Sequence, residues 1–179
     1  AAGIAIPTAL SLASDAIAAT PKKGGKFRMG IAHGSTTDTL DSGTSENHFT
    51  LINGYTFGNH LTEINNEGKL VGELAETFES DDGKTWVFNL RKGVLFHDGE
   101  EFNSEAVKYV VERNKSLNGG ASYIWSSVEK IIIDGPYKIT FILSSPVPFN
   151  KIVSSQYGAW MYSPGISNIS KDSIFNGYA

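Results

Sequence analysis

Histidine is the residue type in this chain best suited to hold a metal ion, and there are four of them, His33, His48, His60 and His97. Their spacing matches no compact ligand pattern such as H-E-x-x-H. The sequence contains no cysteine, which excludes thiolate ligands, disulfides and thiol chemistry. We therefore interpret the histidines as surface or turn residues and expect neither a metal site nor a cofactor.

Carboxylates are the next candidates, because a converging pair could work as general acid and general base. The acidic residues in the middle of the chain lie in predicted turns beside a hairpin, where solvated charge is expected: Glu76, Glu79, Asp81, Asp82, Glu100 and Glu101. The sequence has no G-x-S-x-G nucleophile elbow and no G-x-x-x-x-G-K-S/T phosphate loop. It therefore predicts no catalytic residues and no enzyme. A secreted hydrolase is the alternative of that class, and no residue supports it.

Aromatic side chains are the third candidates, since large amphipathic rings suit an adaptable pocket for a small solute. They gather in the second half of the chain, at Trp125, Tyr157, Trp160 and Tyr162. For any single ring the alternative is packing in the core of a domain, and the residues alone leave that alternative open.

The segment 70–113 has the clearest structural pattern and must position these groups. Asp82-Gly83 lies between apolar runs at 75–79 and 84–90, which predicts a hairpin. Trp86, Phe88 and Leu90 fall on one face of its second strand, as in a half-buried sheet.

A helix is expected next, capped by Asn103 and with Glu105 in its first turn. Val107, Val110 and Val111 give it a buried stripe. A second hairpin is predicted for 128–133 and 137–143, around Asp134-Gly135-Pro136.

The remaining elements are less regular. We expect a first strand at 24–31, a helix over 46–63 capped by Ser45, a flexible loop at 118–122 and a short helix at 149–155. At 179 residues, with 40% hydrophobic content and a net charge of −4, the chain has an ordinary globular composition. It lacks the basic stripe that binding to nucleic acid requires, so no nucleic-acid partner is expected.

Three motifs in this order resemble the extracellular solute-binding proteins of family 5, the dipeptide-, oligopeptide- and nickel-binding receptors of ABC importers. They are Leu-Ala-Glu at 74–76, Asp-Gly-Lys-Thr-Trp-Val-Phe at 82–88 and Leu-Arg-Lys-Gly-Val-Leu-Phe-His-Asp-Gly at 90–99. An Asn-Ser-Glu-Ala helix start follows them. The chain departs from the family at Asp41-Ser42, where members usually carry Asp-Pro or Asn-Pro.

The resemblance implies an α/β fold, part of a periplasmic-binding-protein type II-like lobe with a small, mostly antiparallel β-rich domain inserted. In this interpretation 20–64 begins lobe I, 65–148 is the small α+β domain, and 149–179 returns to lobe I, where an amino-terminal fragment would stop. Family position also implies the solute contacts, which are Ser45, Phe49, Trp125, Tyr157 and Trp160.

Function follows from the same resemblance. The expected protein is an exported, monomeric receptor that captures a peptide, or a related small solute such as chelated nickel, by closing two lobes. It would then deliver the solute to a permease in the inner membrane. The alternative is the ligand-sensing domain of a regulator that uses the same fold.

The start of the chain bears on location. Ala1 to Ala19 is mostly apolar, with Asp15 as its only charge, and Ala16-Ile17-Ala18 is a candidate cleavage site. This pattern is typical of the second half of a signal peptide and predicts export to the periplasm. A transmembrane anchor is the alternative.

Overall fold

The computed structural model describes residues 24–26, 28–39, 41–44, 47–117, 120–154 and 158–165. It divides the chain into two compact units, 1–30 and 31–179, and each is described by itself. The predicted signal segment lies outside the described residues. In the first unit the described residues are in neither helix nor strand. The strand expected at 24–31 is therefore wrong for them; Gly24 and Gly25 have φ values of +76° and +110°, outside the extended region.

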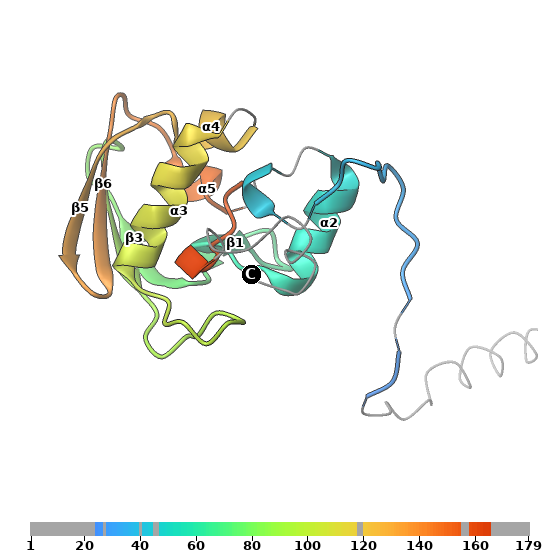
Figure 1. Ribbon diagram of the computed structural model, residues 1–179. Helices are drawn as coiled ribbons and strands as arrows, with labels where there is room; N and C mark the ends of the chain where they lie inside the picture. The colour runs from blue at the N-terminus through green and yellow to red at the C-terminus, as the bar shows by residue number, and fades with distance from the viewer. Residues whose placement is uncertain are drawn as a thin grey trace, which may run out of the picture. The chain divides into compact units, whose positions relative to one another are not determined.

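A four-stranded antiparallel sheet forms the centre of the second unit, with strand order β3-β4-β6-β5 (Figure 1). Its strands are β3 (Ala75–Glu79), β4 (Thr85–Leu90), β5 (Val128–Gly135) and β6 (Lys138–Leu143). Both expected hairpins are confirmed by the pairing of β3 with β4 and of β5 with β6. In the first turn the Asp82 carboxylate accepts backbone N–H bonds from Lys84 and Thr85, at 2.8 and 2.6 Å. Such bonds stabilise a tight turn.

One face of this sheet holds the core. Trp86, Phe88 and Leu90 of β4 are buried, as their alternation predicts. Helices α3 (Ser104–Ser116), α4 (Gly120–Trp125) and α5 (Phe149–Ile152) lie on this side of the sheet (Figure 1). Rings from three elements meet there, with centroids between 5.3 and 6.3 Å apart, and they are Trp125, Phe141 and Phe149. Burying each of these large side chains contributes roughly 1.5–3 kcal/mol to folding.

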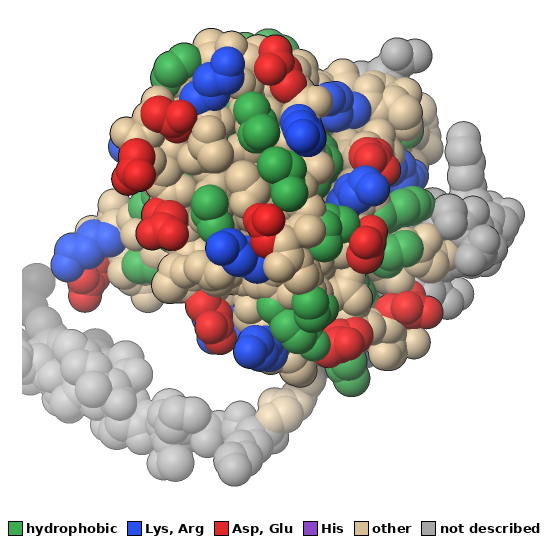
Figure 2. Space-filling view, turned by 90° about the vertical axis from the view of Figure 1, so that its left-hand side faces the viewer, with side chains coloured by type: hydrophobic (Ala, Val, Ile, Leu, Met, Phe, Trp, Pro, Cys, Tyr) green, Lys and Arg blue, Asp and Glu red, His purple; other side chains and the backbone are tan. Residues whose placement is uncertain are grey.

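The opposite face of the sheet carries the charge. Figure 2 shows acidic and basic side chains of both signs interspersed there with apolar ones. An antiparallel sheet with one face packed and the other solvated accounts for the alternating sequence pattern.

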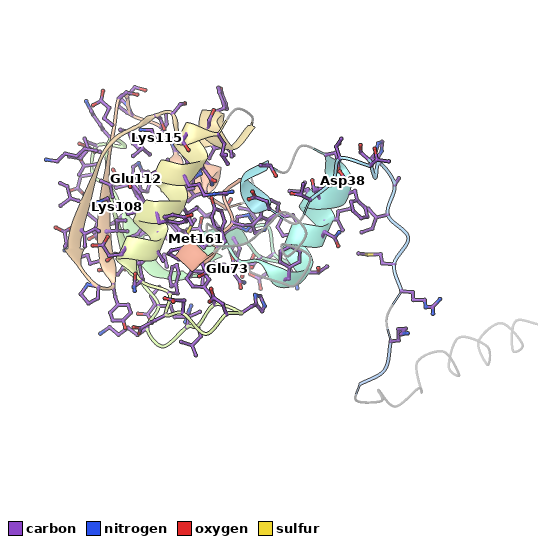
Figure 3. All side chains as sticks on the ribbon, in the orientation of Figure 1. Asp38, Glu73, Lys108, Glu112, Lys115 and Met161 are labelled. Carbon is purple, nitrogen blue, oxygen red and sulfur yellow. The ribbon has the colours of Figure 1, made fainter. Side chains whose placement is uncertain are left out.

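Helix α3 forms as its cap predicts. The Asn103 side chain accepts a 3.0 Å hydrogen bond from the backbone N–H of Ala106. Val107, Val110 and Val111 have no exposed surface. Figure 3 shows Lys108, Glu112 and Lys115 following one another along the helix.

Helix α2 (His48–Phe57) is shorter than expected. Asn47 caps it instead of Ser45, and Thr50 completes a capping box with Asn47. The helix ends where Gly58 becomes extended, and Asn59 then pairs with Met161. A long-range pairing of this kind overrides helical spacing, so the expectation of a helix to residue 63 was wrong.

The segment after α2 forms a small two-stranded sheet of β1 (Thr62–Ile64) and β2 (Leu70–Gly72). Helix α4 was expected to be loop as far as residue 122, and that expectation is also wrong. Its residues Ala121, Ile124 and Trp125 are buried, so tertiary packing forms a helix where the glycines predicted none.

Candidate functional site

The start of α2 carries the first expected solute contact, Phe49. Its ring is half-buried. The Asn47 side chain, which caps the helix, also donates a hydrogen bond to the Asp38 carboxylate. Figure 3 shows Asp38 beside this end of α2. Ser45 lies outside the described residues, so its expected role stays a prediction.

The other end of α2 packs on Trp160, the second expected contact. The Trp160 ring is fully buried, 5.6 Å from Tyr55 and 5.0 Å from His60 between ring centroids. A Cβ added to Gly54 would lie 2.5 Å from Trp160 Cζ2, closer than two non-bonded carbon atoms can approach. Glycine at 54 weakens the helix in isolation, and here it is what allows the indole to lie against it.

Trp125 is fully buried among the core rings. Its indole Nε1 donates a 2.9 Å hydrogen bond to the carbonyl oxygen of Gly158. The Asn114 side-chain amide donates to the same oxygen at 2.8 Å. Gly158 has a φ of +74°, and a Cβ there would meet Ala121 at 2.4 Å, so only glycine fits. Trp125 thus shapes the segment that bears Trp160, and a direct contact of Trp125 with solute stays a prediction.

A polar network reaches the same segment from α3. Arg113 donates two hydrogen bonds to the Asp41 carboxylate, at 2.9 and 2.6 Å, and one to the Tyr162 hydroxyl at 3.0 Å. Burial acts to lower the pKa of Arg113, but the bonds to Asp41 and Tyr162 outweigh it and raise that pKa. Burial raises the pKa of Tyr162. Arg113 therefore stays a cation and Tyr162 a neutral phenol over the physiological pH range.

His60 corrects the interpretation of the histidines. His33, His48 and His97 are exposed, but His60 has only 2% of its surface exposed, and burial lowers its pKa to about 4. Its Nδ1 lies 3.8 Å from Glu73 Oε2, and burial of Glu73 raises the pKa of that carboxyl. The ring is therefore neutral at pH 7, and its Nε2 has no hydrogen-bond partner among the described residues.

Tyr123 is an aromatic residue that is not among the solute contacts expected from the sequence. It has 81% of its surface exposed, whereas Ile124 and Trp125, beside it on α4, are buried. It borders a hollow of about 390 Å³ lined also by Ile124, Ser126, Ser127, Val147 and Ile152. The pattern Ala121-x-x-Ile124-Trp125, apolar at helical spacing, would have indicated which side of α4 faces outwards. Its exposed ring is suited to stacking on a solute.

Within the part of the chain that the structure describes, no three metal-ligating side chains of His, Cys, Asp or Glu come together. Among the same residues, no helix has the length and apolar character needed to cross a bilayer. The expected contact Tyr157 lies outside the described residues, so its role stays a prediction.

Comparison with known proteins gives one family for this arrangement. Residues 69–177 match the model of the bacterial extracellular solute-binding proteins, family 5 (middle region). The glutathione-binding protein GsiB of Salmonella choleraesuis (strain SC-B67) is 31% identical over 141 residues, which cover 77% of this chain and 27% of the relative. GsiB of Escherichia coli (strain K12) is 37% identical over 84 residues, 46% of this chain and 16% of the relative. The chain thus spans about a quarter or less of the length of these curated relatives.

Solved structures agree on the fold. The binding protein AgaA of A. tumefaciens R10, in complex with agropinic acid, has a TM-score of 0.65 and 27% identity, covering 79% of this chain and 28% of that one. OppA of Burkholderia pseudomallei has a TM-score of 0.68 and 17% identity, covering 75% and 30%, and shows the fold alone. The fold is therefore the expected α/β type, part of a periplasmic-binding-protein type II-like lobe with antiparallel sheets. The chain belongs to the bacterial extracellular solute-binding proteins of family 5, which are binding proteins and not enzymes.

Proposed function

We propose that this chain is part of an exported receptor that captures a short peptide, or a related small solute such as chelated nickel, and delivers it to the permease of an ABC importer. The observation that carries the proposal is the family match over residues 69–177. A monomer is expected, with the permease as its protein partner.

A short peptide is the first choice of solute. Relatives at 31% identity are glutathione-binding proteins, and glutathione is a tripeptide with charged groups at both ends. A nickel ABC transporter protein and two binding proteins solved with nickel–histidine complexes are less than 25% identical to this chain, so they support the fold alone and leave chelated nickel as the second choice.

All of the proposed contacts except Ser45 are aromatic. Phe49 at the start of α2 and Tyr123 on α4 are the candidates with accessible rings. Ser45, Trp125, Tyr157 and Trp160 remain proposals, and the two buried indoles among them would shape the site from behind. A stacked ring accepts many solutes, because it uses area and polarisability more than a fixed hydrogen-bond pattern.

Capture is proposed to work by closure of two lobes on the solute, which shifts an open-to-closed equilibrium by differential affinity for the closed form. Since the contacts come from both lobes, this chain alone would bind weakly. Export to the periplasm is part of the proposal and rests on the apolar Ala1–Ala19 segment and on the family's extracellular location.

Native mass spectrometry tests the proposal. The protein would be produced from its complete gene in the periplasm and weighed before and after mild denaturation. Release of a peptide or of a metal chelate supports the receptor function and names the class of solute. A protein that is empty, and stays empty with glutathione, a mixed peptide pool and nickel chelated by histidine, contradicts it.

Tyr123→Ala tests the site. If the ring stacks on the solute, the dissociation constant measured by calorimetry rises roughly fivefold to tenfold, since such contacts contribute about 1 kcal/mol. Leu95→Ala is the matched control, because Leu95 is also a large apolar residue with 64% of its surface exposed. Equal affinities for all three proteins would remove Tyr123 from the site.

A further inference from the structure

Arg113 joins two segments that are far apart in the sequence. It lies in the last turn of α3 and pairs with Asp41, 72 residues away, through both carboxylate oxygens. The side chains are only 22% and 8% exposed. The same guanidinium donates to the Tyr162 hydroxyl and lies 5.2 Å from the centre of that ring. Paired, planar recognition of a carboxylate is specific to arginine.

Asp41 orders the chain that leads to α2. Its Oδ1 accepts a 3.0 Å bond from the backbone N–H of Gly43, and its carbonyl oxygen accepts one from Thr44. These residues form the 3-10 turn η1 (Ser42–Thr44). A Cβ at Gly43 would lie 2.7 Å from the Asn114 side chain and 2.8 Å from that of Arg113, so the turn is pressed closely onto α3.

Tyr162 and Asn114 fix the second segment, 158–162. The Tyr162 hydroxyl, which is fully buried, donates to Asn114 Oδ1, and the amide of Asn114 donates to the carbonyl of Gly158. Both ends of the stretch that contains Trp160 are therefore tied to neighbouring residues of one helix. Polar networks that are satisfied in this way favour a single arrangement of the segments they join.

We propose that Arg113 is a positioning residue for solute binding, and this rests on the proposed function. By holding Asp41 and Tyr162 together, it fixes the segment leading to Phe49 against the segment carrying Trp160. The Phe49 ring and the part of the site that Trp160 supports are then held in one relative placement toward the solute. Arg113 touches no solute itself in this proposal.

A role in folding alone makes a different prediction, and calorimetry separates the two. Loss of folded protein lowers the number of sites per chain and leaves the dissociation constant of the folded fraction unchanged. Loss of positioning raises the dissociation constant while the number of sites stays near one per chain.

The test uses the protein from its complete gene, with reduced glutathione and the nickel–histidine chelate as probes. Arg113→Gln is expected to raise the dissociation constant about tenfold, within the range of coupling energies seen for residues that do not touch the ligand. Arg113→Lys keeps the charge but not the paired geometry, and should give an intermediate value. Tyr162→Phe, which keeps the core filled, should raise it less. Lys108→Gln, on the same helix and without a contact to Asp41, is the control and should bind like the wild type.

The outcomes separate the two proposals. If the wild type binds neither probe nor any co-purified solute, the receptor function fails and the role of Arg113 fails with it. If the wild type binds and the Arg113 and Tyr162 variants keep its dissociation constant, with or without fewer sites, the positioning role alone is refuted.

Discussion

His60 makes the stability of the chain depend on pH in a way that can be calculated. The ring is buried against Trp160 and Tyr55, and its Nδ1 lies 3.8 Å from the carboxylate of Glu73. Burial lowers the pKa from 6.5 to about 4. A difference of one pKa unit between the folded and unfolded chain changes the free energy of unfolding by 1.36 kcal/mol. The lowered pKa of His60 therefore corresponds to roughly 3 kcal/mol.

The sign follows from which state holds the proton. Between pH 6.5 and pH 4 the unfolded chain protonates His60 and the folded chain does not, so the free energy of unfolding rises with pH in this window. The contribution is complete above about pH 6.5 and is lost as the pH falls to about 4. Glu73 acts in the opposite sense: burial raises its pKa, so its contribution is lost as the pH rises through the raised value.

Urea unfolding, followed by tryptophan fluorescence at several pH values from 4 to 7.5, measures the effect. As the pH falls, the free energy of unfolding of the wild type should decrease by roughly 3 kcal/mol more than that of His60→Gln. Glutamine does not titrate, and Glu73 is present in both proteins. His97→Gln removes an exposed histidine and should follow the wild type. If His60→Gln and the wild type have the same pH dependence, the ring is protonated as readily in the folded chain as in the unfolded one, and the reasoning from burial is refuted.

Two further predictions concern single residues. Gly54→Ala should destabilise the chain by about 1–2 kcal/mol in chemical unfolding, because the added Cβ would overlap the buried Trp160 ring. The loss is expected although alanine favours helix. Gly120→Ala, at an open helical position, is the control and should be neutral or stabilising. Asn103→Ala should cost about 1 kcal/mol through loss of the cap on α3, whereas Asn103→Asp keeps the acceptor and should cost less, and a wild-type melting temperature for the alanine variant would contradict the role of the cap.

Sequence patterns predicted the elements that are determined by residues close together in the chain. Asp82-Gly83 and the alternation of Trp86, Phe88 and Leu90 indicated the first hairpin, and the structure confirms the pairing of β3 with β4. Asn103 indicated where α3 begins. In each case residues within a few positions of one another supply both the turn or cap and the apolar face, so no knowledge of distant contacts was needed.

Elements that depend on distant contacts were not predictable in the same way. Helix α2 ends early because Asn59 pairs with Met161, about a hundred positions later. Helix α4 forms on a glycine-rich start because Ala121 packs on Gly158. The pairing of Arg113 with Asp41 crosses 72 positions and leaves no periodic trace in the sequence.

In the candidate site, the sequence likewise did not show which of two nearby aromatic side chains on α4 is exposed. Tyr123 and Trp125 stand two positions apart on α4, and residues at that spacing point to different sides of a helix. Aromatic content drew attention to this stretch but does not say which ring faces outwards. The apolar spacing of Ala121, Ile124 and Trp125 indicates the side only once a helix is expected there, and the helix itself depends on packing against distant residues such as Phe141 and Phe149. The indole therefore serves the core and donates to the carbonyl of Gly158, whereas the exposed phenol is the ring that we propose as a solute contact. A stretch chosen for its aromatic density can thus contain an exposed ring suited to binding while the largest ring in it supports the fold.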